Sequence, residues 1–168
     1  MIEPEVFLKF LKGRRSIRSF QDKSISEKEI EMILEAGRWT PSASNRQPWE
    51  FIVIKNKEIL NKLSKTAFYG EFVKTVPLVI AIVAKVKTSP KWYIIDTSLV
   101  SMHMMLMAWS LGIGTCWIGA MNREKAKQVI GLEENDHILT ILPFGYIEGE
   151  IPEPTSRKSL NKIVKYIN

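Results

Sequence analysis

Cysteine is almost absent from the sequence, since Cys116 is the only one among 168 residues. One cysteine cannot form a disulfide within the chain, and no CxxC pair or His/Cys cluster offers the spacing of a zinc or iron–sulfur site. We therefore expect a reducing, cytoplasmic environment, no bound metal, and a buried, unreactive Cys116. The N-terminus lacks the basic start and apolar run of a secretory signal, so no targeting segment is predicted.

Charge is missing from one long stretch. Residues 97–122 contain no Asp, Glu, Lys or Arg, and a run of that length could cross a bilayer. Several serines interrupt it, and the glycines of Gly112-Ile113-Gly114 divide it. A helix buried in the protein explains the pattern more simply than a membrane span, so we expect no membrane partner.

The basic residues are in excess but dispersed. The net charge is +6 and the pI is near 9.4, which could suggest nucleic acid. No nucleic-acid-binding motif is present, however, and the charges do not gather in one stretch. A solvated surface biased toward anionic ligands is the better interpretation, and we expect no nucleic-acid partner.

The chain is the right size for one domain spanning residues 1–168, with 45% hydrophobic residues and no repeat or linker. Short apolar runs predict central strands at residues 51–54 and 78–83, and a third strand at 137–146. The order of elements indicates an α+β fold with helices packed on a sheet. Helical spacing and caps predict helices at residues 4–13, 26–37, 58–65, 93–111 and 122–130, and a last amphipathic helix carrying Leu160, Ile163, Val164 and Ile167.

The predicted helix at residues 93–111 is apolar nearly all round. A core this small cannot easily surround such a helix. Part of its surface is therefore expected to meet a second subunit.

Two segments could carry chemistry. In Arg14-Arg15-Ser16-Ile17-Arg18, an extended backbone would point the alternate side chains Arg14, Ser16 and Arg18 the same way, as an anion grip requires. A solvated basic turn is the alternative. The second segment is a proline-bracketed loop whose Ser, Asn and Gln side chains suit the polar edge of a heteroaromatic ring, or an ordinary turn. Its sequence is Pro41-Ser42-Ala43-Ser44-Asn45-Arg46-Gln47-Pro48-Trp49.

Together these segments resemble the FMN-binding half of the nitroreductase family, which shares an R-x-S-x-[RK] start and a P-[ST]-x-x-N-x-Q-P-[WH] loop. Residues 112–119, GIGTCWIG, are similar to the family's turn after its long central helix. Residues 154–160, PTSRKSL, are similar to its C-terminal basic pair. The resemblance spans nearly the whole chain in family order. It implies a three-layer α/β/α sandwich with a central mixed, mainly antiparallel sheet, in an obligate-type homodimer.

The resemblance also implies roles for single residues. Arg14 and the Arg157/Lys158 pair would neutralise the FMN phosphate, and Ser16 would bind the ribityl chain or phosphate. Arg18 would lie beside the pyrimidine end of the ring, and Arg15 of the same basic segment would also contact the cofactor. The remaining cofactor contacts would be Asn45 and Gln47 on the polar edge of the ring, Pro41, Ser42, Ala43 and Ser44 reaching the partner's flavin, Trp117 and Ile118 on the apolar side, and the Gly119 N–H at flavin N5.

The implied function is a ping-pong oxidoreductase in which NADH or NADPH reduces FMN and an electron-poor acceptor, such as a nitroaromatic or quinone, then reoxidises it. No catalytic side chain is required, because the flavin carries the chemistry. The short stretch after Thr66 leaves no room for the helical lid of larger members. Two alternatives stay open: a superfamily member with a specific substrate, such as an ene-reductase or dehalogenase, and a flavin-binding or redox-sensing protein without efficient turnover.

Overall fold

A four-stranded sheet forms the middle layer of the computed structural model, which describes residues 2–167. Neighbouring strands are antiparallel throughout. In this part of the chain the one parallel pairing is an isolated bridge between Ser16 and Thr115, so the expected mixed character is confined to that bridge. The strand order is β1-β2-β4-β3, with β1 at Trp49–Ile54, β2 at Leu78–Lys85, β3 at Ile113–Thr115 and β4 at Asp136–Tyr146.

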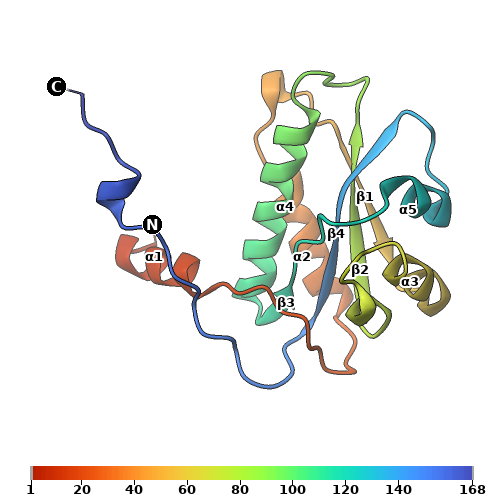
Figure 1. Ribbon diagram of the computed structural model, residues 1–168, viewed down its shortest axis with the longest axis horizontal. Helices are drawn as coiled ribbons and strands as arrows, with labels where there is room; N and C mark the ends of the chain where they lie inside the picture. The colour runs from red at the N-terminus through yellow and green to blue at the C-terminus, as the bar shows by residue number, and fades with distance from the viewer. Residues whose placement is uncertain (1, 168) are drawn as a thin grey trace.

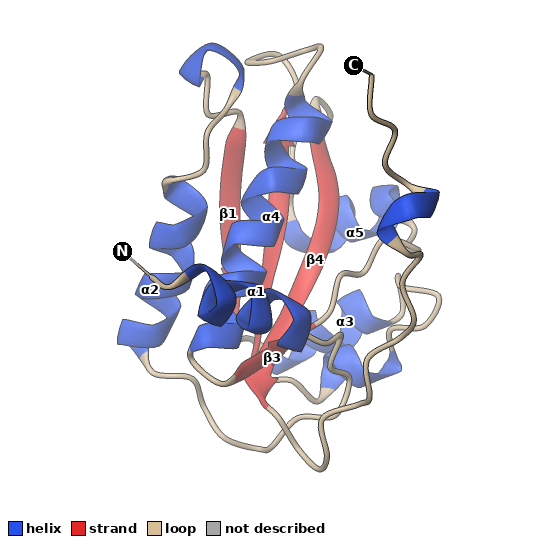
Figure 2. Ribbon diagram, turned by 90° about the vertical axis from the view of Figure 1, so that its left-hand side faces the viewer, coloured by secondary structure: helices blue, strands red, loops and turns tan. Residues whose placement is uncertain are grey.

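Helices cover both faces of the sheet, which confirms the three-layer architecture (Figure 1 and Figure 2). Helices α2 (Glu27–Arg38) and α4 (Tyr93–Ser110) cover one face, and α3 (Lys57–Ser64) and α5 (Arg123–Ile130) cover the other. Strand β2 is buried on both sides, as its continuous apolar run predicts. Its alternate residues divide between two cores, Ile80 and Ile82 toward α2 and α4, and Val79 and Ala81 toward α3 and α5.

Local signals place most helix ends where the sequence predicts them. The capping box at α2 is present, with the Glu29 N–H donating to Ser26 Oγ at 3.3 Å and the Ser26 N–H donating to the Glu29 carboxylate at 2.9 Å. Asn122 caps α5, and Gly131 ends it in the left-handed region at φ 69°. The helices therefore begin and end within a residue or two of their expected positions.

Helix α4 buries only one side. Asp96, Val100 and Met104 face the protein's own core, while Ile94, Ile95, Leu99 and Met102 are exposed. Among residues 2–167, no helix is long and apolar enough to cross a membrane.

Two predictions about the periphery are wrong. Strand β1 lies at the edge of the sheet, not in its centre, and of its six residues only Ile54 is buried. The expected C-terminal helix is reduced to a single 3-10 turn, η3 (Leu160–Lys162). Amphipathic helices depend on packing of their apolar face. This segment lies with α1 (Pro4–Gly13) away from the sheet, and Leu160 and Ile167 are 74% and 88% exposed (Figure 1).

Candidate functional site

The segment after α1 runs extended alongside β3. The Ile17 N–H donates to the Thr115 carbonyl at 3.0 Å, and the Ile17 side chain is buried. A Cβ on Gly114 would lie 2.8 Å from the Ile17 side chain, so a glycine is needed for the two segments to approach this closely. Gly112 has a positive φ of 73°, which lets the chain leave α4 and enter β3. Both glycines of the 112–114 turn thus place the basic segment.

A hollow of about 310 Å³ opens beside this segment. It is lined by Arg14, Arg15, Ser16, Arg18, Pro152, Glu153, Thr155 and Arg157. The N-terminal basic segment and the C-terminal segment therefore meet, although they lie at opposite ends of the sequence. Lys158 does not line this hollow.

The guanidinium of Arg15 donates hydrogen bonds to backbone carbonyls. Its Nη1 donates to the carbonyls of Lys12, Gly13 and Arg14 at 2.7, 3.0 and 2.9 Å. Its Nε donates to the Pro152 carbonyl at 2.8 Å. Arg15 thus closes the C-terminal end of α1 and ties it to the C-terminal segment, which shapes the hollow.

Arg14 has a different environment. Its Nη1 is buried and has no hydrogen-bond partner among residues 2–167. Burial is the largest effect on the pKa of Arg14 and lowers it; Cys116 opposes burial, and the positive charges of Arg15 and then Arg157 lower the pKa further. A buried, unsatisfied cation is costly unless an anion pairs with it. The hollow therefore fits a bound anion.

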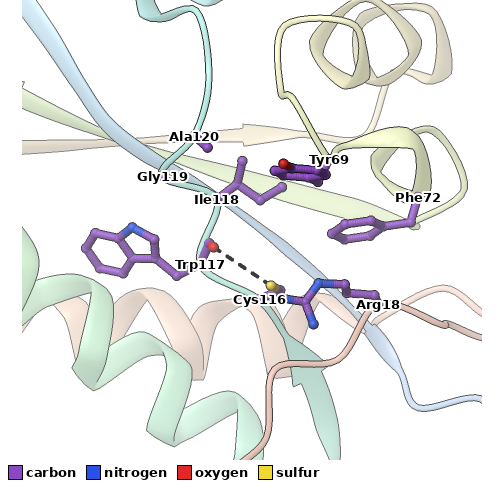
Figure 3. Close-up of a pocket in the computed structure, with 8 residues that line it drawn as sticks. All are labelled: Arg18, Tyr69, Phe72, Cys116, Trp117, Ile118, Gly119 and Ala120. Atoms are coloured by element: carbon purple, nitrogen blue, oxygen red, sulfur yellow. Dashed lines mark hydrogen bonds between the residues drawn. The ribbon is translucent and has the colours of Figure 1, made fainter.

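A second, smaller hollow of about 100 Å³ lies next to the turn after β3, and Figure 3 shows the residues around it. Arg18 lines both hollows. The remaining lining is aromatic or apolar side chains and the backbone of the turn, from Tyr69, Phe72, Cys116, Trp117, Ile118, Gly119 and Ala120. A hollow lined by several arginines and a largely apolar hollow thus meet at Arg18.

Cys116 is buried, 3% exposed, as the sequence predicts. Burial raises the pKa of its thiol. Arg18, a hydrogen bond from Ser16, and Arg14 each lower that pKa, but their effect is smaller than that of burial. A thiol with a raised pKa is a poor nucleophile at neutral pH.

Sequence reasoning missed Tyr69 and Phe72. Tyr69 precedes the 3-10 turn η2 (Glu71–Lys74) and is 85% exposed, and Phe72 lies within that turn. Phe72 stacks on Phe20, with ring centroids 6.2 Å apart. Three aromatic residues within five positions around Gly70, outside the helices that the sequence predicts, were the signal that could have found them.

The loop at residues 41–47 has an unusual backbone. Ser44, Asn45 and Gln47 all have positive φ values, of 52°, 54° and 50°. Such conformations are uncommon for residues other than glycine and gather at functional sites. The buried carboxylate of Asp96 holds the loop by accepting the Ala43 N–H at 3.1 Å.

This loop does not join the other predicted site residues within one chain. Asp96 places it at the N-terminal end of α4, whereas β3 follows the C-terminal end of that helix (Figure 1). An 18-residue helix is about 27 Å long. One chain therefore brings together the Arg14–Arg18 segment, Arg157 and residues 117–119, and leaves the predicted contacts Pro41, Ser42, Ala43, Ser44, Asn45 and Gln47 at the far end of α4.

Comparison with known proteins gives a consistent result. The profile of the nitroreductase family matches residues 11–78 and 64–146. A protein of Archaeoglobus fulgidus, named as a candidate NADH dehydrogenase/NAD(P)H nitroreductase, is 35% identical over 153 residues, which cover 87% of this chain and 88% of that protein.

Solved structures extend the similarity to three dimensions. An FMN-dependent nitroreductase from Clostridium difficile R20291 is 30% identical, covers 96% of this chain and 99% of its own, and superposes with a TM-score of 0.88. A candidate NADH dehydrogenase/NAD(P)H nitroreductase from Parabacteroides distasonis superposes with a TM-score of 0.90 over 97% of this chain and 98% of its own. At 23% identity, the second likeness shows the fold alone.

Proposed function

Because the chain belongs to the nitroreductase family of oxidoreductases, we propose that it is an FMN-dependent enzyme that passes hydride from NADH or NADPH to an electron-poor acceptor. Nitroaromatics and quinones are the acceptor classes that we expect.

The observation that carries the proposal is the buried Nη1 of Arg14, which has no hydrogen-bond partner within the described range 2–167. A phosphate monoester would supply the missing acceptor and offset the repulsion among Arg14, Arg15 and Arg157. Of the two basic residues predicted at the C-terminus, Arg157 lines this hollow. Arg14 and Arg157 would therefore hold the FMN phosphate, and Ser16 would bind the phosphate or the ribityl chain beside it.

The second hollow suits one end of the flavin ring. Arg18, at the junction of the two hollows, would place a fixed cation near the pyrimidine end and favour the negative charge that accumulates on reduction. Trp117 and Ile118 would line the apolar side of the ring, and the Gly119 N–H would donate to N5. When bound, the flavin supplies the redox chemistry, accepting hydride from NAD(P)H and passing it to the acceptor in a ping-pong sequence.

Two chains are needed to complete this site. The loop at residues 41–47 is held at Asp96, about 21 Å along α4 from the end of the helix that leads into β3, so its contacts would reach the flavin of a partner subunit. A homodimer would also cover the exposed apolar surface. That surface includes Ile94, Ile95, Leu99 and Met102 on α4, Val6, Phe7 and Leu8 on α1, and Leu160, Ile163, Tyr166 and Ile167 near the C-terminus.

The test is the visible absorption spectrum of the purified protein after reconstitution with FMN, repeated anaerobically with NADH and then with NADPH. A bound flavin that bleaches supports the proposed enzyme and identifies its donor. A bound flavin that stays oxidised favours a binding or sensing role, and a protein that never retains FMN would overturn the proposal. A panel of nitroaromatics, quinones, enones and halogenated phenols then separates a generalist from a member with one specific substrate.

A further inference from the structure

The two peptide units that flank the Cα of Gly119 are both held by side chains from outside the turn. Thr140 Oγ1 lies 2.9 Å from the Ile118 carbonyl and donates to it, with the Ile141 carbonyl at 3.2 Å as a second acceptor. Arg123 Nη2 donates to the Gly119 carbonyl at 3.1 Å. The Ile118 carbonyl and the Gly119 N–H belong to the same peptide unit, so Thr140 restrains the direction of that N–H, together with an isolated antiparallel bridge between Ile118 and Ile141.

A β-bulge in β4 lies at the point where Thr140 and Arg123 make their contacts. Ile82 of β2 pairs with Thr140 and Val83 pairs with Ile138, so Leu139 is the extra residue. Arg123 donates to the two carbonyls at this bulge, Ile138 at 3.0 Å through Nε and Leu139 at 3.3 Å through Nη2. One guanidinium thus binds the bulge and the Gly119 carbonyl together.

Arg123 stands at an unfavourable place for a cation. It is the first residue of α5, where the helix dipole favours negative charge. Its side chain instead donates to three carbonyls outside the helix, those of Gly119, Ile138 and Leu139. Thr140 is equally specific, because its hydroxyl is fully buried at 0% exposure and its acceptors are backbone carbonyls of the turn and of β4 itself.

We propose that Thr140 and Arg123 are positioning residues that aim and polarise the Gly119 N–H toward flavin N5. A hydrogen bond to the Ile118 carbonyl strengthens the N–H of the same peptide as a donor, since linked hydrogen bonds polarise one another. Arg123 holds the next peptide so that the turn cannot rotate. The inference rests on the proposed function, because it requires the hydrogen bond from the Gly119 N–H to flavin N5.

The contact should discriminate between the two states of the flavin. Oxidised flavin has a lone pair on N5 that accepts a hydrogen bond, whereas N5 of reduced flavin carries a hydrogen and is a poor acceptor. A well-aimed N–H therefore stabilises bound oxidised flavin more than bound reduced flavin. We call the contacts of Thr140 and Arg123 with the peptides around Gly119 the brace. Loss of the brace should weaken binding of oxidised flavin selectively and make the bound flavin easier to reduce.

The experiment replaces Thr140 with Val, which keeps the shape of the side chain and removes the hydroxyl. FMN is titrated into the apoprotein, and the potential of the bound flavin is measured anaerobically against a reference dye. We expect affinity for oxidised FMN to fall roughly 3- to 10-fold, as loss of one hydrogen bond implies, and the potential to rise. Thr140→Ser should restore both values. Thr97→Val removes another fully buried hydroxyl, in α4, and should change neither.

A second variant covers the case in which Thr140→Val does not fold. Arg123 is half-buried, and Arg123→Met keeps its apolar stem while removing all its donors. It should shift the potential in the same direction. Equal loss of affinity for oxidised and reduced flavin, with the potential unchanged, would show that Thr140 and Arg123 have only a structural role and would overturn this proposal. Failure of the unsubstituted protein to bind FMN would instead overturn the proposed function, and the brace with it.

Discussion

Arg14 and Arg157 face one hollow from opposite ends of the chain, and the charge of Arg157 adds to the effect of burial in lowering the pKa of Arg14. No group among residues 2–167 accepts a hydrogen bond from the buried Nη1 of Arg14. The protein therefore carries an electrostatic cost that a bound anion would remove.

Replacing Arg14 with Met should change the apoprotein and the flavin complex in opposite directions. The apoprotein should unfold at the same temperature as the unsubstituted protein or higher, because a half-buried guanidinium with a buried, unpaired Nη1 is gone. FMN affinity should fall roughly 10- to 100-fold, the value of one or two charge-assisted hydrogen bonds. Thermal unfolding with and without FMN measures both effects. An apoprotein that is much less stable, with unchanged FMN affinity, would assign Arg14 to the fold instead.

The C-terminal basic pair offers a matched comparison. Arg157 lines the hollow, whereas the neighbouring Lys158 does not. Arg157→Met should weaken FMN binding clearly, and Lys158→Met should change it by less than about threefold, as expected for a screened surface charge. Titration of FMN into both variants at low and moderate salt distinguishes them. Similar losses in the two variants would indicate a general effect of net charge.

Tyr69 is expected to influence the choice of acceptor. Its ring is highly exposed beside the backbone of residues 117–120, where an aromatic molecule could stack on it (Figure 3). Tyr69→Ala should raise KM for a nitroaromatic acceptor several-fold and leave the rate of flavin reduction by NAD(P)H nearly unchanged. Phe68→Ala is the control, because Phe68 is also exposed but does not line the hollow. Equal changes in both variants would argue against a specific contact.

A site shared between two subunits can be tested by mixing. Arg14→Met damages the anion hollow, and Asn45→Gly removes an amide from the loop while tolerating the positive φ of 54° at that position. If each flavin site takes its hollow from one chain and its loop from the other, mixed dimers regain one intact site. Activity should then recover to about a quarter of the unsubstituted level after equal mixing and subunit exchange. No recovery would place both segments in the same site of one chain.

The parts of the fold that follow from local chemistry could be predicted from the sequence. The Ser26–Glu29 capping box and the left-handed Gly131 mark helix ends without reference to the rest of the chain. The continuous apolar run of β2 also identifies a strand buried on both faces.

The failures depend on long-range arrangement. The spacing of Leu160, Ile163, Val164 and Ile167 is helical, but all four side chains stay exposed in the part of the chain that the structure describes, and only a 3-10 turn forms. Similarly, an apolar run cannot distinguish the edge strand β1 from a central one. At the site, the Arg14–Arg18 segment could be identified from its pattern, whereas Tyr69 and the brace by Thr140 and Arg123 arise only when separate elements meet.

Glu29 should make stability depend on pH in the acid range. Its carboxylate accepts hydrogen bonds from the Ser26 hydroxyl, the Ser26 N–H and the Tyr146 hydroxyl, in that order of effect, and these lower its pKa. A carboxyl group whose pKa is lower in the folded state stabilises the fold above its unfolded pKa, near 4.3, and loses that contribution as the pH falls through the folded pKa.

Glu29→Ala should therefore lower the free energy of unfolding by about 1 kcal/mol at pH 7, a value limited by solvent screening of this partly exposed group. The difference from the unsubstituted protein should shrink as the pH falls below about 4, because the carboxylate is then protonated in both states. Urea unfolding of the apoprotein across this pH range measures it. Glu31→Ala, an exposed position on the same helix, should show almost no difference at either pH. A loss in Glu29→Ala that is as large at pH 3 as at pH 7 would attribute the effect to helix packing, because the removal of a charge can matter only where the carboxyl group is ionised.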